Sequence, residues 1–322
     1  MCICIFKLPI YYNYSYIKNL YILYTMEDKK LKRSLENDKC IHENANSSTV
    51  RSIYPIDNIL WAGNSQFCDN LIIAQSKEFE RMLFTDGELQ STSYDEQIYH
   101  EFLVHPSLTL YYSIYGKKNI NILILGGGEG ATTRELLKYP TNIINKIVWI
   151  DIDKDLIQLS KTHLKYCNDS VYNDKRVCLS YEDANIFLNS TKETFDIIVC
   201  DLPDPWINEN KGLYDDTFWK NLRRIVNQQH IIVTHVGPIQ PGKKNFDFLQ
   251  DLLKKIKLDI SHCKLGKVFI PSFMSEWMYL YFNFTKPIQN QKINLNNLPQ
   301  NLNIVDKDNI INFFDFPRYY QK

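Results

Sequence analysis

The stretch that decides the fold is ILILGGGEGATTRELLKYPTNIINKIVWID, residues 122–151. It predicts a buried strand, a glycine-rich turn, a helix and a second strand that ends at Asp151. Gly126, Gly128 and Gly130 let the backbone turn tightly and approach a ligand closely, and the start of a helix favours polar or anionic groups. The pattern therefore predicts a nucleotide pocket at the edge of a parallel sheet.

The alternation of strand and helix continues after this stretch. RVCLSYED, FDIIVCDL and HIIVTHV follow as apolar strands with helical segments between them, and KVFIPSF and EWMYLYFNF resemble a closing antiparallel pair. Such alternation predicts a parallel sheet covered by helices. Upstream, NLIIAQS and RMLFTDG predict a small antiparallel β unit, and residues 94–116 have helical spacing with a break expected at Pro106.

The amino-acid composition excludes several classes of protein. In 322 residues, 37 Lys and Arg balance 37 Asp and Glu, so no overall charge indicates a nucleic-acid partner or a membrane surface. The 8 cysteines form no CxxC pair, which predicts reduced thiols in a cytoplasmic protein and no metal site. The first 25 residues are apolar but interrupted by Lys7 and Pro9, so they fall short of the roughly 20 apolar residues that a membrane span needs.

Carboxylates follow the second and third strands of the predicted sheet. Asp151 can accept both hydroxyls of a ribose, and Glu182-Asp183 can accept the exocyclic amine of adenine. Glu129, inside the glycine turn, would repel a pyrophosphate and attract a ligand whose tail carries a cation. S-adenosylmethionine and its decarboxylated form both fit, and only the decarboxylated form lacks a competing carboxylate.

The fourth strand ends in DLPDPW, which contains Asp201, Asp204 and Trp206. Open α/β folds bind substrates at this edge of the sheet. Between residues 181 and 216, nine acids stand against two lysines, so a neutral protein concentrates negative charge beside its nucleotide site. This suits a cationic substrate, and Trp206 can line an alkyl-amine channel. A solvated acidic loop is the alternative interpretation; an RNA substrate would need a basic patch, which we do not find.

With the upstream run DGELQSTSYDEQIYHEFLVHP, these motifs have the order and spacing of one family. Residues from about 65 to 285 resemble the polyamine aminopropyltransferases, the spermidine, spermine and thermospermine synthases. The resemblance implies an α/β fold, with a methyltransferase-like Rossmann domain and a small N-terminal β-stranded domain, in a homodimer or homotetramer. It implies transfer of an aminopropyl group from decarboxylated S-adenosylmethionine, a co-substrate and not a tightly bound cofactor, to putrescine or spermidine, releasing methylthioadenosine.

The chain is expected to divide into four parts. Residues 1–50 are expected to be a disordered or extension tail, because 27–50 are polar without an apolar period. Residues 51–115 form the N-terminal β-stranded domain with its linking helix, and 116–288 the Rossmann-like catalytic domain. Residues 289–322 are an Asn-rich C-terminal segment of loose order.

The resemblance also implies roles for single residues. Asp201 matches the proton acceptor, with Tyr99 orienting the amine, and Asp204 matches the acid that holds the acceptor polyamine. Around the aminopropyl tail and the attacking amine lie Gln90, Tyr99 and His100, with Trp206 and Phe273 also on the acceptor side. On the nucleotide side the matches are Gly126, Gly128, Glu129, Gly130, Asp151, Asp183 and Ala184. Without the family motif, Tyr99 and His100 would be interpreted as core residues of a helix.

Some positions depart from the family pattern. Cys68 stands where a Gln is usual, and Leu202-Pro203 replace two serines of the spermidine synthases. Phe273 replaces a common Tyr, and Trp277 resembles the spermine and thermospermine branches. These departures favour spermidine over putrescine as acceptor.

Two other functions stay open. One is an S-adenosylmethionine-dependent methyltransferase on the same sheet. The other is a catalytically silent relative with a regulatory role; intact Asp201, Asp204, Tyr99 and Glu129 argue against it.

Overall fold

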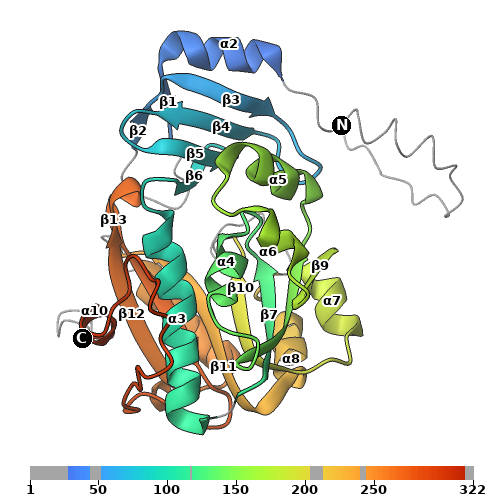
Figure 1. Ribbon diagram of the computed structural model, residues 1–322, viewed down its shortest axis with the longest axis vertical. Helices are drawn as coiled ribbons and strands as arrows, with labels where there is room; N and C mark the ends of the chain where they lie inside the picture. Colours follow the sequence, from blue (N-terminus) through green and yellow to red (C-terminus); the bar gives the residue numbers. More distant parts are fainter. Residues whose placement is uncertain (1–27, 44–51, 117, 204–212, 240–243, 316–322) are drawn as a thin grey trace, which may run out of the picture.

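The structure is a computed structural model that describes residues 28–43, 52–116, 118–203, 213–239 and 244–315. A smaller sheet with a helix above it lies over a larger sheet with helices on both faces (Figure 1). In the described ranges, no helix is long and apolar enough to cross a membrane.

The smaller sheet is an antiparallel meander in the order β3-β4-β5-β6. Alternate residues of β4 point to opposite faces, and both faces are buried: Ile72 and Ala74 join one apolar cluster, Leu71 and Ile73 another. The strands are β3 (Asn58–Gly63), β4 (Leu71–Ser76), β5 (Glu80–Thr85) and β6 (Glu88–Thr92).

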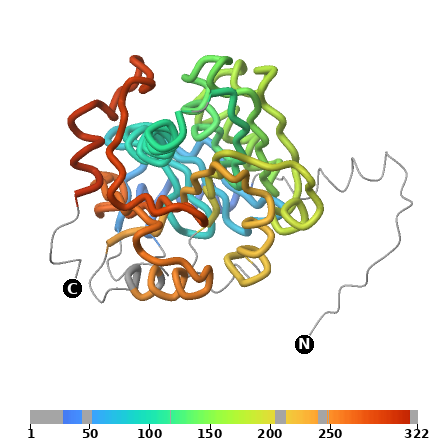
Figure 2. Tube along the Cα trace, turned by 90° about the horizontal axis from the view of Figure 1, so that it is seen from below, coloured from blue at the N-terminus to red at the C-terminus, as the bar shows by residue number. Residues whose placement is uncertain are grey.

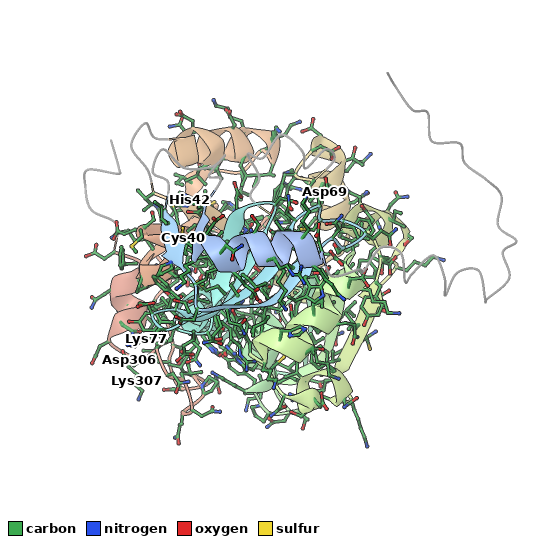
Figure 3. The ribbon with its side chains drawn as sticks, turned by 90° about the horizontal axis from the view of Figure 1, so that it is seen from above. Cys40, His42, Asp69, Lys77, Asp306 and Lys307 are labelled. Atoms are coloured by element: carbon green, nitrogen blue, oxygen red, sulfur yellow. The ribbon has the colours of Figure 1, made fainter. Side chains whose placement is uncertain are left out.

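The polar segment before this sheet is ordered, so the expected disorder of residues 28–43 was wrong. It forms helix α2 (Lys29–Asp38) and strand β1 (Cys40–His42), which pairs with β2 (Ile53–Pro55). Seen from above, α2 lies across the smaller sheet, with Cys40 and His42 near one of its ends (Figure 3). Leu31 and Leu35, one helical turn apart, pack against the cluster around Tyr54. Two apolar positions among many charges are too few to show as a period in the sequence.

The larger sheet has seven strands in the order β12-β13-β11-β10-β7-β8-β9. The five strands from β11 to β9 are parallel, and β13 and β12 add the predicted antiparallel pair. The order reverses between β7 and β10, where open α/β sheets bind ligands. The strands are β7 (Ile120–Gly126), β8 (Ile144–Asp151), β9 (Val177–Tyr181), β10 (Phe195–Asp201), β11 (Val226–Pro238), β12 (Cys263–Ile270) and β13 (Ser275–Phe282).

Helices bury both faces of this sheet, which explains why its central strands read as continuous apolar runs. In β7, Ile122 and Ile124 face the cluster that includes helix α3 (Glu96–Tyr115), and Leu123 and Leu125 face the opposite cluster. The remaining helices of this part are α4 (Ala131–Leu137), α5 (Lys154–Leu159), the π-helix η1 (Ser160–Leu164), α6 (Asp169–Asn173), α7 (Ala184–Ser190), α8 (Asp216–Arg224), α9 (Lys244–Lys255), and the 3-10 turns η2 (Ile260–His262) and η3 (Pro271–Phe273).

Helix α3 runs unbroken through Pro106, where the sequence suggested a break. Proline has no N–H, so the carbonyl of Phe102, four residues earlier, loses its helical donor. The hydroxyl of Tyr281 on β13 donates to that carbonyl. A tertiary contact therefore compensates for the proline and keeps α3 continuous.

The C-terminal segment is anchored more firmly than its Asn-rich composition suggested. It lies beside α3 in Figure 2 and includes the short helix α10 (Asn309–Phe313). The buried carboxylate of Glu101 on α3 accepts the backbone amides of residues 303–305 at 2.8–3.0 Å. The ring of Phe313 stacks on Phe102 with centroids 4.5 Å apart and lies over Gly266, where a Cβ atom would be 1.9 Å from the ring.

Candidate active site

A cavity of about 830 Å³ lies at the carboxyl ends of β7, β8 and β10, between the two sheets. Its volume is within the range usual for small-molecule sites. Its lining comes from β6, the start of α3, the glycine turn, the ends of β8 and β10, η3 and β13. Eleven Asp and Glu side chains line it, and no Lys or Arg does among the residues that the structure describes. The cavity therefore attracts cations.

The glycine turn brings the backbone of β7 against Asp201. Gly126 lies opposite Asp201 across the β7–β10 pair, with φ at +84°, and a Cβ atom there would be 2.0 Å from the Asp201 carbonyl oxygen. At Gly128, a Cβ atom would be 3.3 Å from a carboxylate oxygen of Asp151. Gly130, with φ at +82°, is the N-cap residue directly before α4. Only residues without side chains permit this close approach.

Asp201 is held at the switch point by two hydroxyl groups. The Tyr99 hydroxyl donates to Oδ1 at 2.8 Å, and the Thr132 hydroxyl donates to Oδ2 at 2.6 Å. Burial and the nearby charge of Asp201 hold the pKa of Tyr99 well above its usual range, so its hydroxyl keeps its proton. Two residues 102 positions apart thus form one unit inside the cavity.

His100 lines the same cavity, and its hydrogen bonds show that Nδ1 of its ring carries a proton. Its Nδ1 is 2.9 Å from Oε2 of Glu96 and 2.7 Å from the Glu96 carbonyl oxygen. Both oxygens only accept, so Nδ1 donates. Burial disfavours the imidazolium, but the hydrogen bond and charge of Glu96, with Asp201 and Glu129 nearby, raise the pKa of His100 to about 9.

Two further carboxyl groups lie beside the glycine turn. Burial raises the pKa of Glu129, an effect that His100 opposes and Asp201 reinforces. Asp151, at the end of β8, accepts the amide of Asp153 at 2.8 Å, and burial raises its pKa to about 7. Neither forms an ion pair with Lys or Arg within the described ranges. Both are therefore suited to receive hydroxyl or ammonium groups of a ligand.

The edge of the cavity at β9 contains the predicted adenine pair. Asp183 caps α7: its Oδ1 accepts the amides of Asn185 at 2.7 Å and Ile186 at 3.2 Å. Both bonds use the same oxygen, so the second oxygen can accept from a ligand. Ala184 is buried beside it. On the opposite side, Gln90 of β6 is exposed at the rim.

Aromatic rings form the wall beyond Tyr99. Its ring centroid is 6.5 Å from that of Phe273 and 6.3 Å from that of Trp277, and His235 stacks on Trp277 at 6.0 Å and 27°. Asp95 fixes η3, because its carboxylate accepts the amide and the hydroxyl of the residue before Phe273 at 2.7 and 2.8 Å. Such a wall suits a cation with a methylene chain. Sequence reasoning missed His235, since an isolated His within a predicted strand belongs to no motif.

The departures from the family pattern also lie in this cavity. Cys68, a free thiol, donates to Asp86 at 3.5 Å, and burial and that carboxylate raise its pKa to about 12, which keeps it protonated and unreactive. The carbonyl of Leu202 accepts from Nε2 of His235 at 2.6 Å. Asp204 and Trp206 lie outside the described residues.

Comparisons with known proteins show which family the chain is similar to. The spermine/spermidine synthase domain matches residues 96–295. Over 214 residues the chain is 36% identical to a polyamine aminopropyltransferase of Saccharolobus islandicus, covering 66% of this chain and 68% of that protein. A polyamine aminopropyltransferase of Pyrobaculum calidifontis is 33% identical over 207 residues, covering 63% and 68%.

Solved structures confirm the predicted fold class. A spermidine synthase in complex with the transition state analogue AdoDATO superimposes with a TM-score of 0.71 at 19% identity, covering 88% of this chain and 93% of that one. The spermidine synthase of Thermotoga maritima gives 0.70 at 18% identity, with the same coverage. With the domain match and the two polyamine aminopropyltransferases, the motif-based resemblance is confirmed: the chain belongs to the spermine/spermidine synthase family of aminopropyltransferases.

Proposed function

We propose that this enzyme transfers the aminopropyl group of decarboxylated S-adenosylmethionine to putrescine or spermidine and releases methylthioadenosine. The observation that carries the proposal is the acidic cavity at the switch point, with the Asp201–Tyr99 pair inside it. Both reactants are cations, and a lining of carboxylates without described Lys or Arg can hold them together despite their mutual repulsion.

The donor is proposed to bind along the ends of β7, β8 and β9. Asp151 receives the ribose hydroxyls, and Asp183 with Ala184 contacts adenine. The glycine turn makes room for the sulfonium group. Glu129 holds the aminopropyl ammonium, and Gln90 and His100 lie beside the same tail.

The acceptor is proposed to lie against the aromatic wall. Phe273 and Trp277, with the apolar lining residues Leu213 and Ile239, suit a chain of methylene groups, and this favours the longer spermidine. The proposed roles of Asp204 and Trp206, as acid and aromatic contact for the acceptor, are predictions from the family motif.

The chemistry needs a proton acceptor. An ammonium with a pKa near 10.4 loses its proton at pH 7 at a cost of roughly 4–5 kcal/mol. We assign that proton to Asp201, with Tyr99 and Thr132 holding the carboxylate. The freed nitrogen attacks the methylene carbon beside the sulfonium: the C–N bond forms, the C–S bond breaks, and its electron pair stays on sulfur as the neutral thioether. Asp201 then passes the proton to solvent.

The assembly, the location and the domain limits complete the proposal. The family resemblance supports a homodimer or homotetramer in the cytoplasm, and light scattering on the purified chain tests the assembly. The domain limit at residues 115 and 116 coincides with the end of α3. Separate expression of residues 116–322 tests whether that part folds alone.

Labelled donor tests the function. The enzyme is incubated with decarboxylated S-adenosylmethionine carrying ¹⁴C in the aminopropyl carbons, with putrescine and with spermidine separately, and the amines are separated by chromatography. We expect labelled spermidine or a labelled tetra-amine, with methylthioadenosine in equal amount. Label from a methyl-labelled donor in the product would instead establish a methyltransferase. Methylthioadenosine binding without transfer to either amine would establish a silent relative.

A further inference from the structure

A buried row of alternating charges leads from the core of the protein to the cavity. We call Glu135, Arg134, Glu96 and His100 the charge ladder. Nε of Arg134 is 2.9 Å from Oε1 of Glu135, and its two terminal nitrogens are 2.7 and 2.9 Å from the two oxygens of Glu96. Glu96 in turn contacts Nδ1 of His100 at 2.9 Å. Each group is thus held by the next.

The ladder is too well buried to be a surface feature. The side chains of Glu96 and His100 are each 3% exposed and that of Glu135 is 0% exposed. Hydrogen bonds from His100 and Arg134 overcome the effect of burial and lower the pKa of Glu96, so it is an anion. The fork of Arg134 fixes both oxygens of that anion, which leaves the His100 contact with a single geometry.

A second buried histidine of α3 shows that burial alone does not make an imidazolium here. His105 contacts Oε2 of Glu135 through Nε2 at 2.9 Å, and its Nδ1 lies 3.0 Å from the Tyr139 hydroxyl. Burial lowers the pKa of His105, so one nitrogen donates and the other accepts in the neutral ring. His105 also has Glu101 nearby, but the charge of Lys138 opposes the effect of both acids on its pKa, whereas His100 lines the cavity together with Glu129 and Asp201.

We propose that His100 is a placeholder cation: its imidazolium balances Glu129 and Asp201 in the empty site and gives up its proton when the cationic donor binds, with Glu96 and Arg134 as positioning residues that hold it. This rests on the proposed function, because the donor must be the decarboxylated sulfonium. The step balances, since the imidazolium proton leaves to solvent and the donor's ammonium replaces its charge beside Glu129.

Linkage gives the sign of the effect. The groups whose charge acts on His100 are Glu96 on its own helix, Glu129 in the glycine turn and Asp201 at the end of β10, with the Tyr99 ring 5.0 Å away. The positive charge of a bound ligand offsets the negative charge of these acids, so the imidazolium is stabilised less and the pKa of His100 falls. At any pH between the pKa of His100 in the empty enzyme and its lower pKa in the complex, binding must then release a proton.

Calorimetry of donor binding in two buffers of different ionisation enthalpy counts that proton. At pH 8 a group with a pKa of about 9 is roughly nine-tenths protonated in the empty enzyme. We expect decarboxylated S-adenosylmethionine to release roughly 0.5–0.9 proton. Methylthioadenosine, a neutral thioether with the same adenosine, should release almost none. It also controls for Asp151, which the ribose contacts in both ligands.

Two matched variants separate positioning from folding. Glu96→Gln removes the carboxylate that sustains the imidazolium, so donor binding should release close to no proton at pH 8. Glu135→Gln removes an equally buried carboxylate of the same ladder that does not touch His100, and its proton release should equal that of the wild type. If Glu96 had only a structural role, both variants would lose stability alike. The number of protons released on donor binding would then be the same in both variants as in the wild type.

Equal proton release from the donor and from methylthioadenosine in the wild-type enzyme would overturn the proposal, even if Glu96→Gln fails to fold. Wild-type release from His100→Gln would overturn it as well. Turnover measured on the same preparation separates this result from a failure of the proposed function. If the enzyme transfers the aminopropyl group but donor binding releases no more protons than methylthioadenosine binding, the proposed function stands and the role of His100 as a placeholder cation is refuted. If the enzyme does not bind the donor, both proposals are refuted.

Discussion

Asp201→Asn is the substitution that most sharply divides catalysis from stability in this enzyme. Asparagine keeps the shape of the side chain but replaces one carboxylate oxygen by an NH₂ group. In the structure both oxygens are in use, one by Tyr99 at 2.8 Å and one by Thr132 at 2.6 Å. One of these hydroxyls must therefore turn and accept from the amide, and we expect a loss of about 1–3 kcal/mol in the free energy of unfolding.

The effect on turnover should be much larger than this stability loss explains. The acceptor ammonium must lose a proton at a cost of roughly 4–5 kcal/mol at pH 7, and general-base assistance typically supplies about 10²–10⁴ in rate. An amide cannot take that proton. We expect kcat to fall at least about 100-fold, with methylthioadenosine binding nearly unchanged, because the adenosine contacts lie at other strand ends. The assay is chromatographic measurement of methylthioadenosine release.

Asp196→Asn is the matched control at the other end of β10. Asp196 is 1% exposed and accepts from the Tyr111 hydroxyl at 3.3 Å and the Asn227 amide at 2.9 Å, so it reproduces the buried acid–tyrosine contact away from the cavity. Its substitution should lower the melting temperature to a similar degree and leave kcat of the folded enzyme near wild type. Near-normal turnover of Asp201→Asn would refute the reasoning, as would an equal loss in both variants.

Three more predictions follow from the same contacts. Tyr99→Phe removes a hydrogen bond to an anion worth about 1.5–3 kcal/mol, so kcat should fall roughly 10- to 150-fold. The control Tyr279→Phe loses a hydroxyl that donates to the Tyr99 carbonyl at 3.2 Å, and its kcat should stay near that of the wild type. Similar kcat values for the two variants would contradict this prediction. Because burial raises the pKa of Asp151 to about 7, its ribose-accepting carboxylate is lost as pH falls through that value; methylthioadenosine affinity, titrated from pH 8 to 5.5, should fall in the wild type and not in Asp151→Asn. Gly126→Ala places a Cβ 2.0 Å from the Asp201 carbonyl at a φ of +84°; denaturant unfolding should show at least about 2 kcal/mol of destabilisation, and a stable variant would mean that β7 and β10 can separate.

The parts of the site that could be predicted lie where local pattern and sheet topology coincide. Gly126, Asp151 and Asp201 each end a predicted parallel strand, and parallel strands bring such ends to one edge. Tyr99 and His100 needed the family motif, because helical spacing alone places them equally well in the core. Their roles in catalysis stay predictions until variants are measured.

The parts that could not be predicted depend on contacts between distant segments. Glu96 and Arg134 are 38 residues apart, and neither sequence context indicates a pair. His235 reaches the aromatic wall through the pairing of β11 with β13, where it lies opposite Tyr279. Helix α2 and the packing of Phe313 were not predicted, because a few apolar side chains in polar segments produce no hydrophobic period in the sequence. Tertiary packing, not propensity, orders these elements.

A crystal structure with methylthioadenosine tests the central claim most directly, namely that carboxylates at the edge of the sheet gather two cationic reactants around one proton acceptor. We predict the ribose on Asp151, the adenine beside Asp183, and the thioether sulfur facing the cavity between Glu129 and the Asp201–Tyr99 pair. Methylthioadenosine bound elsewhere, or bound with its sulfur directed away from Asp201 and with Glu129 turned to bulk solvent, would contradict the account.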